Sequence, residues 1–322
     1  MNYGQRILVQ PHQSSEKYEA DVIAIARGID LAILELEDAS FFDTHPPAEL
    51  SPELPRIGSM VHAIGYPMGG DALSVTAGIL SRIEYTDYNQ GTLGLRMQVD
   101  TPLNPGNSGG PVFVDNKVIG IVFSGIPSAE NIGYVIPTEE IEMFLADVED
   151  GSYEGTPRIF PHLQTAENPA IRKKLGLESA DTGLIVTSAD DDSMLKPWDV
   201  IVALGEHDID NRGMVAVDGG FRLHFGYYVP KLANNGTVPV TVIREGESQT
   251  IDLPVMPRLN ALQKSLDGAY PSYLVHGPMV FTPSYAELAQ AAARAAPLLA
   301  ASGNPIIERL GDEVEFEGEQ LV

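Results

Sequence analysis

The sequence contains no cysteine, which excludes disulfide bonds, thiolate catalysis and cysteine-ligated zinc. Basic residues are scarce, because 20 Lys and Arg stand against 45 Asp and Glu, for a formal net charge of −25. Such a charge repels phosphate backbones and argues against nucleic-acid binding as a primary role. Long apolar runs are also missing: residues 289–301 are interrupted by polar residues and proline, and a membrane span needs ~20 apolar residues.

Short β-rich runs separated by turn signals dominate the first 150 residues. These runs are residues 6–10, 21–26, 31–36, 59–65, 72–83, 111–114, 118–123 and 133–136. Closely spaced strands of this kind favour a barrel or a sandwich over alternating β and α units. Residues 138–148 have helical periodicity and an acidic first turn, so we predict a helix that closes this region.

A Gly-, Ser- and Pro-containing stretch at 151–157 is typical of a linker. The pattern then changes to a mixed α+β region, with a short helix near 169–175 and strands at 183–187, 198–204, 237–244 and 250–253. A further β-rich run, an Ala-rich segment and an acidic tail follow. We therefore expect three regions, 1–150, 157–256 and 268–322, in a chain that is truncated at both ends.

The strongest chemical signal is the motif that surrounds Ser108, Asn-Pro-Gly-Asn-Ser-Gly-Gly-Pro at 104–111. A serine nucleophile needs backbone N–H groups that point at the oxygen which becomes negative in the tetrahedral intermediate. Glycines on both sides permit the backbone conformations that such a turn requires. We expect Ser108 to be the nucleophile and the N–H groups of Gly106 and Ser108 to form the oxyanion hole.

The same motif satisfies Gly-x-Ser-x-Gly, the nucleophile elbow of α/β-hydrolases. An elbow lies between a strand and a helix, whereas residues 111–114 predict a strand directly after Ser108. The acid and base of an elbow also follow the serine, whereas the best candidate aspartate here precedes it. A Gly-rich hairpin with an incidental serine is the remaining alternative.

That aspartate is Asp30, which stands directly ahead of the run 31–36. An aspartate at the start of a buried strand is well placed to be shielded and to orient a histidine. A turn aspartate that caps a loop is the alternative interpretation.

Five motifs occur in a fixed order: Asp-Leu-Ala-Ile-Leu at 30–34, Ala-Ile-Gly-Tyr-Pro at 63–67, residues 74–83, residues 100–111, and Asn-Ile-Gly-Tyr-Val-Ile-Pro at 131–137. Their order and spacing resemble those of HtrA/Deg serine proteases, most closely the plant-type Deg enzymes and their bacterial relatives. The resemblance implies a mainly β chain with a chymotrypsin-like double β-barrel, its first barrel incomplete here, followed by PDZ-like α+β modules. It also implies a catalytic triad in the order His, Asp, Ser.

The base of that triad is not found among the histidines of the sequence, which are His12, His45, His62, His162, His207, His224 and His276. The resemblance places the base just ahead of the strand at 6–10. His12 follows that strand in a polar loop, and His62 falls within a later strand. We expect the base to lie upstream in a longer parent protein. The alternative is a pseudoprotease that has lost it.

The resemblance also assigns two binding regions. The primary specificity pocket is expected between two walls, Thr101, Pro102 and Leu103 on one side and Ile121, Phe123, Ser124 and Gly125 on the other. With no charged side chain expected to face it, this pocket should prefer small to medium apolar side chains. The PDZ carboxylate-binding loop reads Ile159, Phe160, Pro161 and His162. Since proline has no N–H and phenylalanine is bulky, we expect weak capture of peptide ends there.

For the full-length parent we expect an ATP-independent serine endopeptidase that cleaves unfolded or damaged proteins. The absence of a P-loop from the sequence fits ATP independence. We expect no cofactor, no metal and no membrane span, and the resemblance implies self-association into trimers or larger assemblies. A periplasmic location is favoured over a cytoplasmic one in a bacterium. The alternatives are an inactive PDZ scaffold or chaperone-like pseudoprotease, and an α/β-hydrolase esterase, which would need a helix after Ser108.

Overall fold

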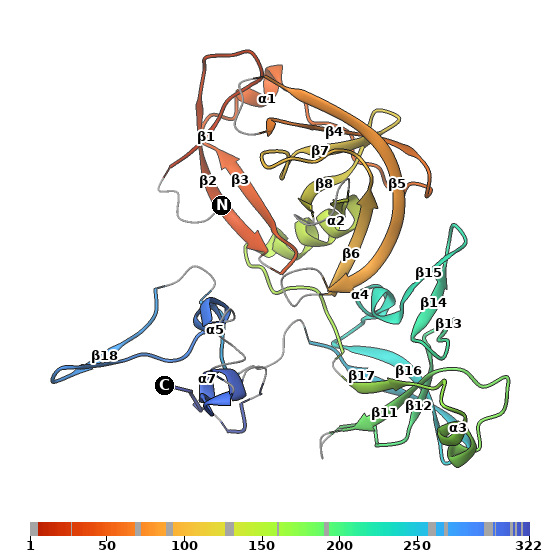
Figure 1. Cartoon of the computed structure of the whole chain (residues 1–322). Helices are drawn as coiled ribbons and strands as arrows, with labels where there is room; N and C mark the ends of the chain where they lie inside the picture. The colour runs from red at the N-terminus through yellow and green to blue at the C-terminus, as the bar shows by residue number, and fades with distance from the viewer. Residues whose placement is uncertain are drawn as a thin grey trace. The chain divides into compact units, whose positions relative to one another are not determined.

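The structure is a computed structural model that describes residues 6–26, 28–67, 72–87, 93–125, 132–159, 161–189, 193–256, 262–266, 270–292, 299, 301–309, 312, 314–316 and 318–322. The chain divides into two compact units, Met1–Val255 and Met256–Val322. Strands dominate the first unit, so the prediction of a mainly β protein is confirmed (Figure 1).

The chain begins with a three-stranded antiparallel sheet in the order β1-β2-β3. Its strands are β1 (Ile7–Val9), β2 (Tyr18–Ala26) and β3 (Leu31–Leu36). Only Ala20, Ala26 and Leu31 are buried on these strands, while Ile23 and Ile25 are exposed. The expectation that 31–36 is a buried strand is therefore wrong beyond Leu31, because most of β3 is only half covered.

A closed six-stranded barrel follows, in the order β4-β5-β6-β9-β8-β7. Its strands are β4 (Met60–Gly65), β5 (Ser74–Asp87), β6 (Leu93–Val99), β7 (Pro111–Val114), β8 (Lys117–Gly125) and β9 (Gly133–Pro137). Pairing of Ala63 with Val112 closes the barrel. Alternate residues of each strand point inward, as a closed barrel requires, and Val61, Leu80 and Met97 are fully buried there.

Helix α2 (Thr138–Asp147) ends in the short η2 (Val148–Asp150) and covers one side of this region, whereas α1 (Phe41–Thr44) is a single turn after β3. Phe144 of α2 joins a core that connects the three-stranded sheet to the closed barrel. That core also contains Ala26, Ile29, Leu31, Phe123, Tyr134 and Ile136. The turn before β3 is therefore anchored on the barrel.

The rest of the first unit is an α+β module around a second sheet, in the order β10-β11-β12-β16-β17 with β13 beside β12. Its elements are β10 (His162–Thr165), α3 (Pro169–Leu175), β11 (Leu184–Ser188), β12 (Val200–Leu204), β13 (His207–Asp208), β14 (Met214–Val217), β15 (Phe221–His224), η3 (Phe225–Tyr228), α4 (Val229–Leu232), β16 (Thr237–Arg244) and β17 (Glu247–Pro254). Helix α3 begins at Pro169, capped by the Asn168 side chain, and ends at Gly176 with φ 67°, the usual signals for helix ends.

The α+β module and the closed barrel share a hydrophobic core. Leu223 of β15 and Tyr227 of η3 pack into the same cluster as Tyr85 of β5. The Lys231 Nζ donates a hydrogen bond to the Tyr227 hydroxyl at 2.7 Å and forms an ion pair with Glu139 of α2 at 2.5 Å. Residues 151–157 therefore connect two parts that are packed together.

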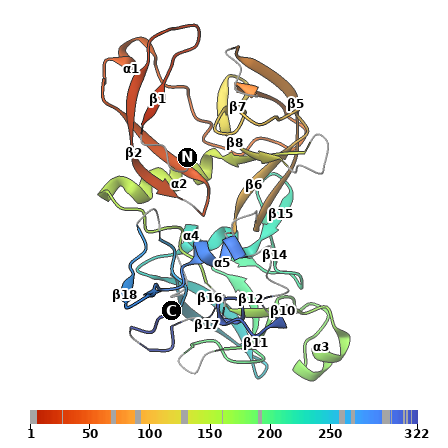
Figure 2. The same cartoon turned by 60° about the vertical axis from the view of Figure 1, so that its left-hand side comes forward.

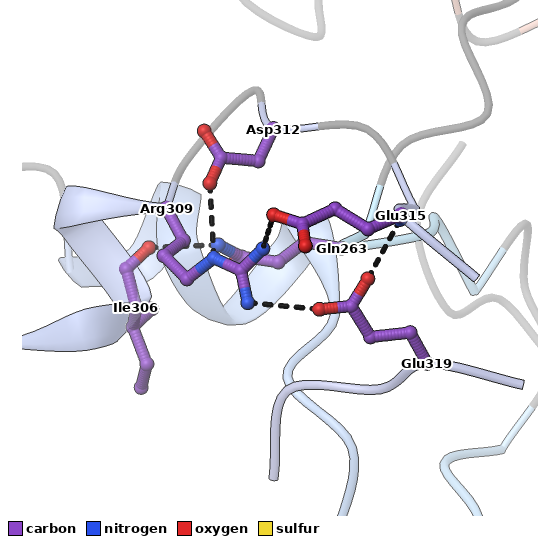
Figure 3. Close-up of polar contacts among 6 residues, drawn as sticks. All are labelled: Gln263, Ile306, Arg309, Asp312, Glu315 and Glu319. Atoms are coloured by element: carbon purple, nitrogen blue, oxygen red, sulfur yellow. Dashed lines mark hydrogen bonds and ion pairs between the residues drawn. The ribbon is translucent and has the colours of Figure 1, made fainter.

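The second unit contains a hairpin, β18 (Leu274–His276) and β19 (Met279–Phe281), and the short helices α5 (Ala286–Ala292) and α7 (Pro305–Glu308) (Figure 2). Arg309 follows α7 and forms ion pairs with Asp312 and Glu319 at 2.9 Å and with Glu315 at 3.6 Å (Figure 3). These contacts hold part of the acidic tail against α7. Across the described residues of both units, no helix has the length and apolar character to cross a membrane.

Candidate active site

Ser108 lies in a turn between the loop that follows β6 and strand β7. Gly106 and Gly109 have φ values of 103° and 84°, which favour glycine, so the turn needs glycine on both sides of the serine. Hydrogen bonds tie the turn to strand β8: the Gly109 N–H donates to Val122 O, and the Val122 N–H donates to Gly110 O, both at 2.8 Å. The serine side chain is exposed at the end of this rigid turn.

Only some of the backbone N–H groups of the turn donate hydrogen bonds within the described structure. The Asn107 N–H donates to Asn104 O at 3.0 Å, and the Gly110 N–H donates to Asn107 O at 2.9 Å. The N–H groups of Gly106 and Ser108 donate to no partner among the residues that the structure describes. Two amides next to an exposed hydroxyl are thus available to an incoming oxygen, the feature that an oxyanion hole requires.

Strand β4 approaches the turn closely at Gly65. A methyl group on Gly65 would lie 2.7 Å from Asn107 Oδ1 and 2.9 Å from Asn107 Cα, so no larger residue fits without a shift of the turn. Strand β7 then starts at Pro111, three residues after Ser108. The prediction of a strand directly after the serine is confirmed, and the nucleophile elbow of α/β-hydrolases is excluded because it requires a helix there.

Asp30 occupies the turn between β2 and β3 with a left-handed φ of 59°, which aspartate tolerates better than most residues. Its neighbours Ile29 and Leu31 are buried, with exposed fractions of 2% and 8%, whereas the Asp30 side chain itself is exposed. The expected shielding is therefore partial. Partial burial still raises the pKa of the Asp30 carboxyl, and the positive charges of the N-terminal amino group and, to a smaller extent, of Arg96 oppose that shift.

Phe123 of β8 links the two candidate residues. Its side chain packs in the same core as Ile29 and Leu31, on either side of Asp30. Its carbonyl oxygen accepts a 3.4 Å hydrogen bond from the Ser108 Oγ. Phe123 thus joins the two turns: its carbonyl is bonded to Ser108, and its side chain lies in the same core as the residues that flank Asp30.

The two expected walls of the specificity pocket are adjacent to each other. Leu103 lies so close to Gly133 of β9 that a methyl group on Gly133 would clash with its side chain. Gly133 pairs with Gly125 of β8, so the loop 101–103 lies beside the end of β8. Phe123 is buried and Ile121 half-buried, whereas Pro102 is exposed and Thr101 is fully buried. The side chains of Ser124 and Gly125 lie outside the described residues.

None of the seven histidines bonds to Ser108 within the described part of the chain. The His12 Nδ1 lies 3.0 Å from the hydroxyl of Tyr66, the residue after Gly65. His224 accepts the Gly226 N–H at Nδ1 and is half-buried. The others are His45 after α1, His62 on β4, His162 on β10, His207 on β13 and His276 on β18.

Sequence reasoning missed a buried basic residue behind the pocket. Arg96 of β6 is 1% exposed, and its Cζ lies 5.3 Å from the centre of the Phe123 ring. The prediction that no charged side chain faces the pocket did not consider a charge behind its wall. An arginine between the apolar residues Leu95 and Met97 was the available signal, but β6 itself had not been predicted as a strand.

The remaining predicted site falls at the start of the α+β module. Ile159 and Pro161 precede β10, which begins at His162, and Phe160 lies outside the described residues. Strand β10 is at one end of its sheet and pairs with β11 alone in the described part of the chain. No group of three or more His, Asp or Glu residues among the described ones is arranged to hold a metal ion.

Comparisons with known proteins find similar sequences among proteases. The trypsin-like peptidase domain model matches residues 5–121. Protease Do-like 2, chloroplastic, of Arabidopsis thaliana is 36% identical over 292 residues, which cover 88% of this chain and 48% of that protein. Protease Do-like 4, mitochondrial, of the same plant is 36% identical over 281 residues, which cover 85% of this chain and 54% of that protein. The chain thus spans about half the length of the curated relatives it matches.

Solved structures of HtrA-type proteases are similar to this chain. The HtrA-type protease AlgW with tripeptide has a TM-score of 0.60 and 25% identity, over 79% of this chain and 82% of that chain. The same protease with decapeptide has a TM-score of 0.60 at 22% identity, over 80% of this chain and 77% of that chain, which shows a shared fold. With the barrel and the serine turn, these similarities show that the chain belongs to the HtrA/Deg family of serine proteases.

Proposed function

We propose that Ser108 is the nucleophile of a serine endopeptidase and that Asp30 orients the histidine that activates it. In this mechanism the Ser108 Oγ attacks the peptide carbonyl, and the N–H groups of Gly106 and Ser108 stabilise the oxyanion. One observation carries the proposal: an exposed serine stands in a glycine-dependent turn of a closed barrel, beside two amides with no partner among the described residues.

The proposed base is a histidine ahead of β1, in a longer product of the same gene. The seven histidines of the chain support this. The Ser108 Oγ donates a hydrogen bond to Phe123 O, and no histidine in the described structure forms a hydrogen bond with Ser108. A histidine can exchange a proton with Ser108 only if it comes within hydrogen-bonding distance of it in the complex with substrate.

The proposed substrates are unfolded or damaged proteins, cleaved without ATP in protein quality control. Exposed peptide segments fit an open site, and the walls formed by Leu103, Ile121 and Phe123 favour a small or medium apolar side chain. The names of the plant relatives support proteolysis. Self-association into trimers or larger assemblies is part of the same proposal.

We further propose that residues 157–256 are a PDZ-like module, followed by the start of a second one at 268–322. An edge strand such as β10 can pair with an extended peptide, which is how PDZ domains bind their ligands. Pro161 removes one N–H donor from the loop that would receive the terminal carboxylate. Weak capture of peptide ends is therefore expected, and titration with C-terminal peptides would measure it.

The decisive experiment compares the complete gene product with its Ser108→Ala and Asp30→Asn variants in cleavage of unfolded casein without ATP. We expect Ser108→Ala to lower kcat by ~10⁴-fold or more and Asp30→Asn by ~10⁴-fold. Ser188→Ala, on the exposed end of β11, serves as the matched control and should cleave normally. Equal cleavage by Ser108→Ala and Ser188→Ala would overturn the assignment.

The 322-residue chain on its own provides a second readout. It should react only slowly with a fluorophosphonate probe, because no described histidine deprotonates Ser108. Brisk, stoichiometric labelling would show that one of the seven histidines is the base.

The alternative is an inactive scaffold or chaperone-like pseudoprotease, favoured by the absence of a histidine bonded to Ser108 among the described residues. It predicts that the complete gene product suppresses aggregation of unfolded protein without cleaving it, and that Ser108→Ala changes nothing.

A further inference from the structure

Arg96 is a charged side chain in the interior of the protein. It lies on β6 between Leu95 and Met97, whose side chains fill the closed barrel. Because side chains alternate along a strand, Arg96 points to the opposite face, towards the core that joins the barrel to the three-stranded sheet. Its Nη1 donates to Leu95 O at 2.7 Å, and its buried Nε has no partner among the described residues. A buried cation with so few hydrogen bonds is costly unless nearby charges compensate it.

Glu140 of α2 supplies one such charge. It is 3% exposed, and its Oε1 accepts the Leu95 N–H at 2.5 Å, so its carboxylate is fixed to the same strand as Arg96. Burial raises the pKa of Glu140, and the Leu95 hydrogen bond and Arg96 both oppose that shift. Two other groups face this region: Tyr85 of β5, whose pKa burial raises to about 12, and Arg158, which donates to Leu93 O.

The backbone of β6 leaves room for the guanidinium group. A methyl group on Gly94 would lie 2.7 Å from the Arg96 Nη1 and 3.2 Å from Cζ. The space that a side chain at 94 would need is thus taken by Arg96. Its position is therefore specified by three neighbours, Gly94, Leu95 and Glu140.

Arg96 contacts Phe123, the residue that links the two turns of the candidate site. Its Cζ is 5.3 Å from the centre of the Phe123 ring, within range of a cation–π interaction. The carbonyl of Phe123 accepts the Ser108 hydroxyl, and the Phe123 ring packs beside the residues that flank Asp30. Burial raises the pKa of Asp30, and the charges of the N-terminal amino group and, to a smaller extent, of Arg96 oppose that shift.

We propose that Arg96 is a positioning residue of the candidate active site, which holds the Phe123 ring behind the Asp30 turn and places a positive charge there, and that Glu140, bonded to the same strand, compensates this charge. The assignment rests on the proposed function, since Asp30 and Ser108 are its catalytic residues. A catalytic carboxylate that orients a histidine must stay charged. Arg96 supplies the positive charge from behind the pocket wall, where it contacts no substrate.

The test is the titration of the Asp30 carboxyl by carbon NMR in the full chain, with Asp30→Asn to assign the resonance. In Arg96→Met, which keeps length and loses charge, we expect the midpoint of the Asp30 titration to move to higher pH. Arg96→Lys should retain most of the wild-type midpoint. Arg82→Met is the matched control, since Arg82 on neighbouring β5 is half exposed and bonds to Gln98. Its Asp30 midpoint should not move.

An Asp30 midpoint that is the same in Arg96→Met, Arg82→Met and wild type would overturn the proposal. If Arg96→Met does not fold, the double variant Arg96→Met, Glu140→Met replaces both buried charges with apolar side chains of similar length, an exchange that proteins often tolerate. The same upward shift is expected there, and an unchanged midpoint would again overturn the proposal. The titration needs no peptidase activity. A failure of the endopeptidase assignment would appear in casein cleavage and leave this result intact.

Discussion

The two regions that hold the candidate catalytic residues are stabilised in different ways. Ser108 belongs to a closed barrel whose interior residues, such as Val61 and Leu80, are completely buried. Asp30 belongs to an open three-stranded sheet in which Leu8, Ile23 and Ile25 are exposed. The sheet is well packed only at one end, where the turn 28–31 meets the barrel core through Ile29 and Leu31.

This difference shows how an open sheet can still position an acid. The carboxylate needs a fixed turn, and two buried neighbours of Asp30 fix it on Phe123 of the barrel. The barrel additionally receives Leu223 and Tyr227 from the α+β module, so it is covered from outside as well as filled from within. We therefore expect stability to reside in the barrel and to be insensitive to the far end of the sheet.

The largest expected effect comes from a matched pair of substitutions, Leu80→Ala in the barrel and Leu8→Ala on β1. Leu80 is 0% exposed and Leu8 is 41% exposed. Loss of a fully buried leucine leaves a cavity, so Leu80→Ala should lower the free energy of unfolding by ~2–5 kcal/mol. Leu8→Ala should cost less than ~1 kcal/mol. Urea denaturation measures both, and equal losses would show that the open sheet is as tightly packed as the barrel.

A smaller effect is expected at the contact between β4 and the serine turn. Gly65→Ala places a methyl group 2.7 Å from Asn107 Oδ1 and 2.9 Å from a backbone atom, so the turn must shift. Overpacking of this kind costs ~1–3 kcal/mol, and urea denaturation should show it.

Gly58→Ala is the control for Gly65→Ala. Gly58 has open space around its Cα but a φ of 89°, so the substitution adds backbone strain without a collision. We expect it to cost ~1 kcal/mol and to leave the amide resonances of the serine turn in place, whereas Gly65→Ala should move them. Unmoved resonances in Gly65→Ala would show that the turn is not held by β4.

Much of the fold could be predicted because strand periodicity and turn residues are local signals. Strand β7 and strand β16 have the predicted bounds, and the strand after Ser108 was enough to reject a nucleophile elbow. Strand β6 was not predicted, although Leu93, Leu95, Met97 and Val99 alternate with Gly94, Arg96 and Gln98 as they would in a strand with one buried face. Only the closed barrel shows that Leu95 and Met97 face one core while Arg96 faces another.

The candidate site was partly predictable for the same reason. Ser108 and Gly106 lie within one short motif, so the sequence alone indicates their chemistry. The dependence of Asp30 on Phe123 and Arg96 joins residues that are far apart in the chain, and no local pattern reveals such contacts. The packing of Tyr85 against Tyr227 was hidden likewise, and the linker composition of 151–157 suggested more separation than the shared core allows.

The contact between barrel and module has a titratable group of its own, His224. Its ring stacks on Tyr85 with an interplanar angle of 6°, and its Nδ1 accepts the Gly226 N–H at 3.1 Å. Burial lowers the pKa of His224, so the folded protein holds it neutral where the unfolded chain takes up a proton. The resulting stability is present above pH ~6.5 and is lost as the pH falls from there towards the lower folded pKa.

The expected result is a loss of at most ~1 kcal/mol in the free energy of unfolding per pH unit below 6.5, since one proton contributes no more than ~1.4 kcal/mol per unit. His224→Gln should flatten this part of the pH profile, and His276→Gln, at an exposed position on β18, should leave it as in wild type. Urea denaturation at several pH values between 5 and 7 would measure all three. If the free energy of unfolding depended on pH in the same way in His224→Gln and wild type, His224 would not be kept neutral in the folded protein.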